Sequence, residues 1–253
     1  MTIMDVRNRR RALLDAMQRD GEVQVRQLAT ELGCSEMTVR RDLDVLERDG
    51  VVRRVHGGAV RVQLRRDELP YAARALEAIE AKQRIARAVA GLISDAETVI
   101  LDSGTTGLEV ARALRGRPVT VLPLGLRALL ELADDDQVSL ICPGGDVRPG
   151  ELTVTGDLAE VAFERLRFDT LVLSGCGLHE REGVTTHVPA DARLRRAALG
   201  AARRTILASD AAKIGQVTFG RVCSLDVAER LVTDATPELT GPLEAAGLPV
   251  QHV

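Results

Sequence analysis

Side chains that can contact nucleic acid gather in two short segments near the start of the chain. Arginine donates hydrogen bonds to phosphate oxygens and to O6 and N7 of guanine, and threonine contacts phosphate or the thymine methyl group. The candidate residues are Ser35, Met37, Thr38, Arg40, Arg41, Arg53, Arg54 and His56. These residue types predict a surface that binds duplex DNA. For His56 we favour contact with phosphate, although plain turn surface is the alternative.

A second group of candidates follows apolar runs in the remainder of the chain. The segment Asp102–Gly107 combines glycines with hydroxyl donors, and it leads into a predicted helix whose N-terminus favours anions. Such a loop can hold a phosphate monoester, although an ordinary strand-to-helix turn with a capping hydroxyl has the same composition. With the loops after other strands, the candidate anion site comprises Asp102, Ser103, Gly104, Thr105, Thr106, Gly144, Gly145, Cys176, Thr185, Asp210 and Lys213.

Three members of this second group allow more than one role. Lys213, one of only two lysines, can pair with an anionic sugar, which is the role we favour, or form a salt bridge with Asp210. Thr185 and the adjacent Thr186 either line the same opening or hold a loop. Cys176 can serve packing, contact the ligand or act as a redox-sensing thiol.

The spacing of apolar residues predicts three helices that position the first group. They cover residues 6–17, 28–32 and 35–49, and Ser35 can cap the third. The buried stripe of the third helix is Val39, Leu43 and Leu46. Two short strands around the turn His56–Gly58 follow, which is the pattern of a wing after a helix-turn-helix. A three-helix interaction module with merely solvated arginines is the alternative.

Beyond these helices, short β-branched runs alternate with helical stretches. An amphipathic helix from Leu76 to Ile93 comes first, and the predicted strands begin at Thr98, Val119, Val138, Thr170, Thr205 and Arg230. Apolar strands separated by helices predict a mostly parallel sheet, covered on both faces, that binds ligands at the carboxyl ends of its strands. We therefore predict an α/β protein with a winged helix-turn-helix DNA-binding domain over 1–61, a linker over 62–75 and an effector-sensing domain over 76–253.

Charge and composition support this division and argue against other classes of protein. Residues 1–66 carry 14 Arg against 10 acidic residues, a charge of +4, so the rest carries 20 basic against 27 acidic residues, a charge of −7. A basic module joined to an acidic one is expected if only the first meets a polyanion. Aromatic residues make up 2% of the chain, which argues against stacking on single-stranded nucleic acid. Without a long apolar run or a signal segment, we expect a cytoplasmic protein with no membrane partner.

Metal and dinucleotide sites are not predicted. The four cysteines and four histidines lack the spacing of metal ligands. The segment Gly175–Gly177 lacks the third glycine of a dinucleotide fingerprint, because Glu180 stands in its place. We expect no metal and no cofactor.

The first module closely resembles the winged helix of the DeoR family of bacterial transcription regulators. The resemblance rests on the residues Leu28-Ala29, Ser35–Leu43, Leu46-Glu47, Gly50 and Arg53–Ala59. It implies that Thr38, Arg40 and Arg41 belong to the helix that contacts DNA and that residues 53–58 form the wing. It also implies that Asp42 and Leu43 hold that helix in place.

The second module is similar to the sensor domain of the same family. The matching segments are Leu101–Thr106, Gly144-Gly145, Gly177, Gly183–Thr186, Ser209–Gly215 and Val232–Asp234. This resemblance implies a fold like that of the ribose 5-phosphate isomerase and CoA-transferase group. It further implies a phosphorylated sugar or related metabolite as effector, and repression that the effector relieves. Two positions depart from the family pattern: Pro123–Gly125 replaces a polar Thr-Asn-Ser loop, and Cys176 stands where an acidic residue is common.

Two functions from different classes compete. The leading one is a DNA-binding transcription regulator with a metabolite sensor, which we expect to be a homodimer or tetramer because one short helix contacts too few base pairs. The rival is an isomerase or acyl-CoA transferase carrying an added DNA-binding or adaptor module. An isomerase needs a positioned base, usually a carboxylate, but Cys176 and Gly177 occupy the loop where it is wanted. We therefore expect no catalytic residues.

Overall fold

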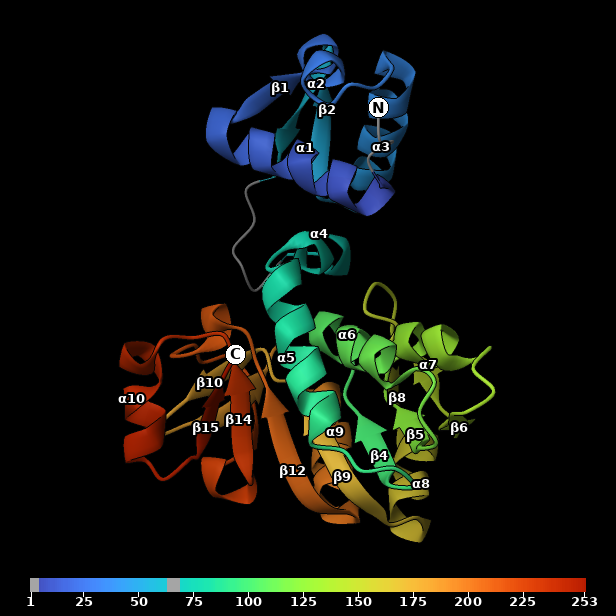
Figure 1. Ribbon diagram of the computed structural model, residues 1–253, viewed down its shortest axis with the longest axis vertical. Coiled ribbons are helices and arrows are strands. Elements are labelled where there is room, and N and C mark those ends of the chain that lie inside the picture. Colours follow the sequence, from blue (N-terminus) through green and yellow to red (C-terminus); the bar gives the residue numbers. More distant parts are fainter. Residues whose placement is uncertain (1–4, 63–68) are drawn as a thin grey trace. The chain divides into compact units, whose positions relative to one another are not determined.

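The computed structural model (Figure 1) describes residues 5–62 and 69–253. The chain divides into two compact units, Met1–Glu77 and Ala78–Val253. Each unit has hydrophobic core residues of its own, which is the mark of separate domains. The two units are called unit 1 and unit 2 below.

Unit 1 combines helices with a small antiparallel sheet. Its elements are α1 (Val6–Asp20), β1 (Glu22–Gln24), α2 (Val25–Glu31), α3 (Glu36–Arg48), β2 (Val52–Val55), β3 (Gly58–Arg61) and α4 (Tyr71–Leu76). The strand order β1-β3-β2 adds one strand to the predicted wing. The β2–β3 turn requires glycine, because φ is +79° at Gly57 and a Cβ at Gly58 would lie 2.0 Å from the Val23 carbonyl oxygen. The predicted winged helix-turn-helix is confirmed.

Part of the segment predicted as a linker is folded. From Tyr71 onward it forms α4, and Ala73 is fully buried in the core of unit 1. Residues 63–68 of that segment lie outside the described residues. The prediction of one helix running from Leu76 to Ile93 is wrong at its start, because Ala78 adopts a left-handed φ of +49° and separates α4 from α5 (Ile79–Gly91).

Unit 2 is built on a seven-stranded sheet whose neighbouring strands all run parallel. The strand order is β15-β14-β12-β9-β4-β5-β6. The strands are β4 (Thr98–Leu101), β5 (Thr120–Pro123), β6 (Ser139–Leu140), β9 (Phe168–Leu173), β12 (Ala202–Ala208), β14 (Arg230–Thr233) and β15 (Val250–His252). The first six coincide with the predicted apolar runs, so the parallel α/β class is confirmed; β15 was not predicted.

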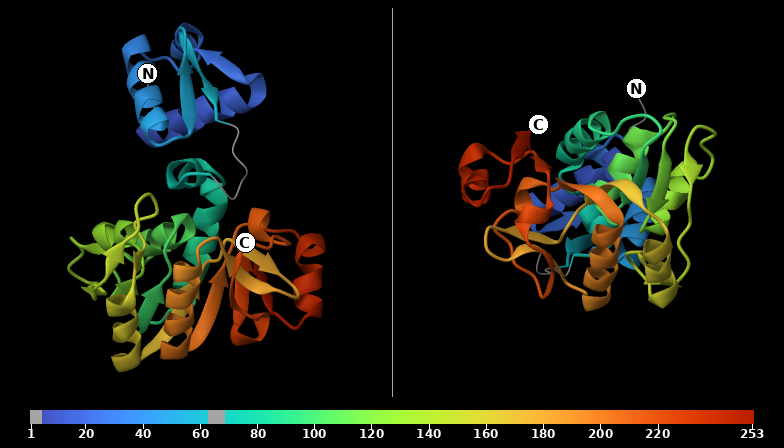
Figure 2. Two further views of the ribbon diagram at one scale, coloured as in Figure 1. Left: turned by 180° about the vertical axis from the view of Figure 1, so that it is seen from behind. Right: turned by 90° about the horizontal axis from the view of Figure 1, so that it is seen from below.

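Helices cover both faces of this sheet (Figure 2). They are α5, α6 (Thr105–Leu114), α7 (Leu126–Leu132), α8 (Asp157–Arg165), α9 (Pro189–Ala201) and α10 (Pro237–Ala245). Val99 and Leu101 of β4 pack with α5, α6 and α7, whereas Ile100 between them packs with α8, α9 and α10. Alternate side chains of one strand are thus buried on opposite faces, which is why the strands are continuous apolar runs.

Shorter elements follow several strands of the sheet at their carboxyl ends. They are the three-stranded antiparallel sheet of β10 (Gly177–His179), β11 (Gly183–Thr186) and β13 (Gly220–Cys223), the hairpin of β7 (Asp146–Val147) and β8 (Val154–Thr155), and the 3₁₀ turns η2 (Ala211–Lys213) and η3 (Leu225–Val227). Within the described ranges, no helix is both long enough and apolar enough to cross a bilayer.

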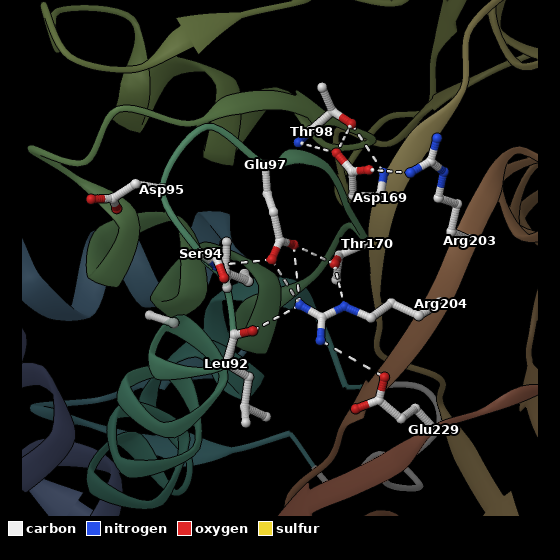
Figure 3. Close-up of polar contacts among 12 residues, drawn as sticks. Leu92, Ser94, Asp95, Glu97, Thr98, Asp169, Thr170, Arg203, Arg204 and Glu229 are labelled. Atoms are coloured by element: carbon white, nitrogen blue, oxygen red, sulfur yellow. Dashed lines mark hydrogen bonds and ion pairs between the residues drawn. The ribbon is translucent and has the colours of Figure 1, made fainter.

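A polar network fastens the opposite, amino ends of β4, β9 and β12 (Figure 3). Arg204 donates to both carboxylate oxygens of Glu97 at 3.1 Å and to the hydroxyl of Thr170 at 2.8 Å. The backbone N–H and hydroxyl of Thr98 donate to Asp169 at 3.0 and 2.7 Å. Burial acts to raise the pKa of Glu97, but the Ser94 N–H, Thr170 and Arg204 outweigh it and lower the pKa. The network holds the three strands together at the end away from the candidate anion site.

Candidate functional site

The N-cap and first turns of α3 carry five of the eight residues of the first group. Ser35 is the N-cap: its hydroxyl accepts the Thr38 N–H at 3.1 Å and lies 2.9 Å from the Thr38 hydroxyl. The buried face of the helix is apolar, as predicted, with Val39, Leu43 and Leu46. Met37 is 57% exposed, and Arg40 and Arg41 are exposed too. The helix therefore offers cations and a hydroxyl to solvent from its first turns.

A buried carboxylate fixes α3 from behind. Asp42 accepts a hydrogen bond from Nε of Arg9 at 2.6 Å and from Nε of Arg10 at 3.0 Å, and both arginines belong to α1. Only 3% of Asp42 is exposed, whereas Arg40 and Arg41 immediately before it face solvent. One side of α3 is thus attached to α1 through Asp42, and another side exposes its arginines to solvent. This agrees with the role expected of Asp42.

The wing brings the remaining DNA candidates close to α3. Arg53 and His56 are exposed, and Arg54 is half-buried. The Arg54 guanidinium pairs with Asp44 of α3, and the Arg54 N–H donates to Glu47 Oε1 at 2.8 Å. An exposed helix beside a basic hairpin is the arrangement that places a helix in the major groove and a wing on the adjacent backbone.

In unit 2, Asp102 at the end of β4 is the centre of a buried cluster. Its carboxylate accepts from Nε of Arg195 at 2.9 and 3.0 Å and from the N–H groups of Ser103 at 2.8 Å and Ser174 at 2.9 Å. Asp102 is 1% exposed and Arg195 is 5% exposed. Burial acts to lower the pKa of Arg195, but the charge of Asp102 outweighs it and raises the pKa above its ordinary value.

Hydroxyl groups from three segments extend this cluster. Arg195 donates from Nη1 to the Thr186 hydroxyl at 2.9 Å and from Nη2 to the Ser103 hydroxyl at 3.5 Å. The Ser103 hydroxyl also accepts from Thr153 at 3.1 Å. Cys176 Sγ lies 3.5 Å from the Thr186 hydroxyl. The loops after β4 and β9, strand β11 and helix α9 therefore meet at one point, as expected of the carboxyl edge of a parallel sheet.

Cys176 has an unusually acidic thiol within this cluster. Burial acts to raise its pKa, but a hydrogen bond from His187, the charge of Arg195 and the hydroxyl of Thr186 outweigh it and lower the pKa to about 6. Burial instead raises the pKa of Cys223 to about 11. The contrast between the two thiols indicates that the surroundings of Cys176 favour a negative charge. Groups that stabilise a thiolate also stabilise an anionic ligand.

Lys213 joins the cluster through Ser174. Its Nζ donates to the Ser174 hydroxyl at 3.2 Å, and the Ser174 N–H is bound to Asp102. The carboxylate of Asp210, only 4% exposed, accepts the Ala212 N–H and caps η2. A salt bridge between Lys213 and Asp210 is not found among the described residues.

Other predicted residues of the anion site lie apart from this cluster or serve the framework. Gly144 and Gly145 pack beside Leu158 and Thr155; a Cβ at Gly145 would lie 2.3 Å from the Thr155 carbonyl oxygen. The Thr185 hydroxyl accepts the Thr218 N–H at 3.0 Å, so it holds a loop. Thr105 and Thr106 are buried in the first turn of α6. In the described part of the chain, the Thr106 hydroxyl has no hydrogen-bond partner.

A small cavity borders the same strand ends. Its volume is about 10 Å³, space for about one water molecule, and it is lined by Leu173, Gly175, Gly177, Leu178, Val184, Leu207 and Ser209. The lining is mostly apolar and contains none of the predicted site residues, although Cys176 and Asp210 are sequence neighbours of lining residues. The polar cluster and the cavity are therefore adjacent features of one edge of the sheet.

Comparison with known proteins resolves the family. The chain matches the DeoR-like helix-turn-helix domain over residues 9–64 and the DeoR C terminal sensor domain over residues 77–235. The chain belongs to the DeoR family. It is a DNA-binding transcription regulator with an N-terminal helix-turn-helix and a C-terminal sensor.

Relatives match this DeoR family regulator along nearly its whole length. It is 32% identical to the HTH-type transcriptional regulator GlpR of Haloferax volcanii, over 96% of each chain. It is 29% identical to the lactose phosphotransferase system repressor of Lactococcus lactis, over 91% of this chain and 92% of that protein. Among solved structures, ribose 5-phosphate isomerase A from Methanocaldococcus jannaschii is 12% identical over 51% of each chain, with a TM-score of 0.38.

The β5–α7 loop of this DeoR family member is apolar, as its sequence indicates. Pro123 and Leu124 are buried, and the Leu124 N–H donates to the Leu101 carbonyl at 2.8 Å. A Cβ at Gly125 would lie 3.2 Å from Cβ of Ser103, so a side chain there would crowd the Asp102 cluster. The loop presents no polar side chain to the cluster.

Sequence reasoning missed four members of the cluster in this DeoR family protein: Arg195, Ser174, Thr153 and His187. A signal for Arg195 was present. On α9, Asp191, Arg195 and Ala198 stand at helical positions i, i+4 and i+7, and all three are buried, so the charged pair lies on the apolar face of the helix. Ser174, Thr153 and His187 carry no comparable pattern, because each lies in a loop or beside one.

Proposed function

We propose that this DeoR family regulator is a repressor and that a phosphorylated sugar or related metabolite releases it from DNA. The observation that carries the proposal is the construction of α3. Arg40 and Arg41 are exposed, whereas the next residue, Asp42, is buried and attaches α3 to α1. The lactose phosphotransferase system repressor, a relative along nearly the full length, supports repression as the direction of control.

The chemistry at the carboxyl edge of the sheet supports an anionic effector. Although burial acts to raise the pKa of the Cys176 thiol, a hydrogen bond from His187 and the charges of Arg195 and Lys213 lower it. Gly104, the N-cap of α6, offers no side-chain cap to the N–H groups of the first turn. Cations and helix N–H groups together favour a phosphate group. The ligand residues we propose are the predicted residues Ser103, Gly104, Cys176 and Lys213 beside Asp102, with Thr186 and Arg195 as supports.

Control of DNA binding requires that the effector bind one state of the protein better than another. A homodimer or tetramer supplies such states, because a change in self-association alters the spacing of two recognition helices. We include a cytoplasmic homo-oligomer in the proposal. Light scattering tests it: a monomer at working concentration would contradict this mechanism of control.

The proposal includes no enzymatic activity. Asp102, the carboxylate nearest to the cluster's centre, has both oxygens engaged by Arg195 and by backbone N–H groups. A general base needs a free lone pair directed at the proton it removes, and Asp102 has none to spare. Incubation with a panel of phosphorylated sugars separates the alternatives: binding without turnover supports the sensor, and turnover would support an isomerase.

A thermal-shift screen tests the effector class directly. Each phosphorylated sugar is compared with its unphosphorylated counterpart, using the full-length chain. A ligand that binds the folded state alone raises the melting temperature in proportion to the logarithm of its concentration. We expect a shift from at least one phosphorylated compound and none from its counterpart. A panel without any phosphorylated hit would contradict the assignment of an anion site.

A further inference from the structure

Arg54 of the wing is committed to contacts within unit 1. Its guanidinium pairs with Asp44, its Nε donates to the Gly58 carbonyl at 3.3 Å, and its backbone N–H donates to Glu47 Oε1 at 2.8 Å. Its side chain is 24% exposed, in contrast to the exposed Arg53 beside it. Adjacent arginines on one strand therefore have different environments, as expected when successive side chains point to opposite faces.

The contacts of Arg54 connect the three elements that a winged helix must align. Asp44 and Glu47 are three residues apart on α3 and so lie on the same side of that helix. Arg54 belongs to β2, and Gly58 begins β3 directly after the turn. A single residue thus joins the recognition helix to both strands of the wing.

The charge of Asp44 gives this pairing a second consequence. The Asp44 side chain is 57% exposed and lies one turn beyond Arg40 and Arg41 on the helix that contacts DNA. An uncompensated carboxylate there would repel the phosphate backbone. The Arg54 guanidinium neutralises that carboxylate, and a guanidinium paired in this way is not available to release a counterion from DNA.

We propose that Arg54 is a positioning residue of the DNA interface: its guanidinium, paired with Asp44, sets the wing against α3 and does not itself neutralise a DNA phosphate. The proposal rests on the DNA-binding function of the chain. The sequence predicts that Arg54 contacts DNA. In the proposed role Arg54 contacts Asp44 instead, and Arg53 contacts the phosphate.

The salt dependence of DNA binding tests the proposal. The affinity of the full-length chain for a mixed-sequence duplex is measured over a range of salt concentrations for the parent, for Arg53→Gln and for the double variant Asp44→Asn with Arg54→Gln. The double variant removes the ion pair without leaving Asp44 uncompensated. Each phosphate contact contributes about 0.9 to the slope of log K against log salt. We expect Arg53→Gln to lower the slope by about 0.9 and the double variant Asp44→Asn with Arg54→Gln to leave it unchanged. An equal loss of slope in the double variant Asp44→Asn with Arg54→Gln would overturn the proposal, while failure of the parent chain to bind any duplex would instead contradict the DNA-binding function.

A charge exchange tests the positioning role. The readout is the ratio of affinities for the duplex upstream of the chain's own gene and for the mixed-sequence duplex. Arg54→Asp places two carboxylates side by side, and we expect the ratio to fall about tenfold, equivalent to about 1.4 kcal/mol. The double variant Asp44→Arg with Arg54→Asp restores an opposite-charge pair, and we expect the ratio to recover to within about threefold of the parent. A double variant as poor as Arg54→Asp would show that Arg54 acts on DNA itself.

Discussion

At the scale of single residues, one buried ion pair organises the sensor site. Asp102 could be predicted from the sequence because it ends an apolar strand and begins a glycine-rich loop. Its partner Arg195 is 93 positions away, and only the fold brings the two together. The general lesson is that loop chemistry can be found from local sequence, whereas the groups that neutralise it come from distant elements. Conversely, several predicted ligand residues, such as Gly145 and Thr185, have framework contacts that no local pattern reveals.

The substitution Asp102→Asn tests the ion pair. It leaves the buried Arg195 guanidinium with only Asp191, 3.9 Å away, as a carboxylate partner, so we expect the free energy of unfolding of unit 2 to fall by about 3 kcal/mol. Urea denaturation followed by circular dichroism measures the change. Arg193→Gln is the matched control, because Arg193 on the same helix makes exposed ion pairs and should cost less than about 1 kcal/mol. Equal effects of the two substitutions would contradict the assigned role of the buried pair.

The thiol of Cys176 supplies a pH-dependent test. Its pKa of about 6 makes it a thiolate above pH 6, so the rate of alkylation by iodoacetamide should rise through pH 6 and level off by neutral pH. Cys223, with a pKa of about 11, should stay protonated and slow throughout that range. Peptide mass spectrometry follows both residues in one sample. A midpoint for Cys176 near the ordinary value of about 8.5 would contradict the charged environment described for it.

At the scale of elements, the parallel strands and their helices could be predicted, and the small sheets could not. Strands β4, β5 and β9 are apolar runs because both faces of the sheet are covered. The three residues of β10 show no periodicity, and their pairing is set by the fold. The end of α4 was missed because alanine favours helix, and only the tertiary structure holds Ala78 in a left-handed conformation.

Attachment of α3 to α1 is tested by Asp42→Asn. The buried carboxylate holds Arg9 and Arg10, and each lost charged hydrogen bond weakens the docking of α3. We expect unit 1 to lose about 2 kcal/mol of unfolding free energy, because the two arginines are partly exposed and regain water. Asp15→Asn, at an exposed residue 3.9 Å from Arg11, is the control and should change stability little. A stability of the Asp42→Asn variant equal to that of the control would rule out this attachment.

Specific contact by α3 is tested by Arg41→Ala. If the exposed guanidinium contacts a base edge, affinity for the chain's own upstream duplex should fall by about 1–3 kcal/mol, with a smaller loss on a mixed-sequence duplex. Arg19→Ala removes another exposed arginine, at the end of α1, and should spare the preference between the two duplexes. Filter binding at fixed salt measures both. An unchanged preference in Arg41→Ala would place the base-contacting surface elsewhere.

At the scale of the whole molecule, the charge difference between the two parts of the chain anticipates the division of labour. The basic part contains the helix-turn-helix and the acidic part contains the sensor. The classes of both domains could be predicted, because apolar residues at helical spacing mark the first and apolar strands alternating with helices mark the second. The identity of the effector could not, since the Pro123–Gly125 loop offers no polar side chain that would narrow the chemistry of the ligand.

The most direct test of control by a metabolite is the affinity of the full-length chain for the duplex upstream of its own gene. Fluorescence anisotropy measures it with and without each phosphorylated sugar of a panel and each unphosphorylated counterpart. We predict tighter binding to the upstream duplex than to a mixed-sequence duplex, and release by a phosphorylated compound but not by its counterpart. Equal affinity for both duplexes, or a complex that every phosphorylated compound leaves intact, would contradict a DNA-binding regulator with a sugar-phosphate sensor.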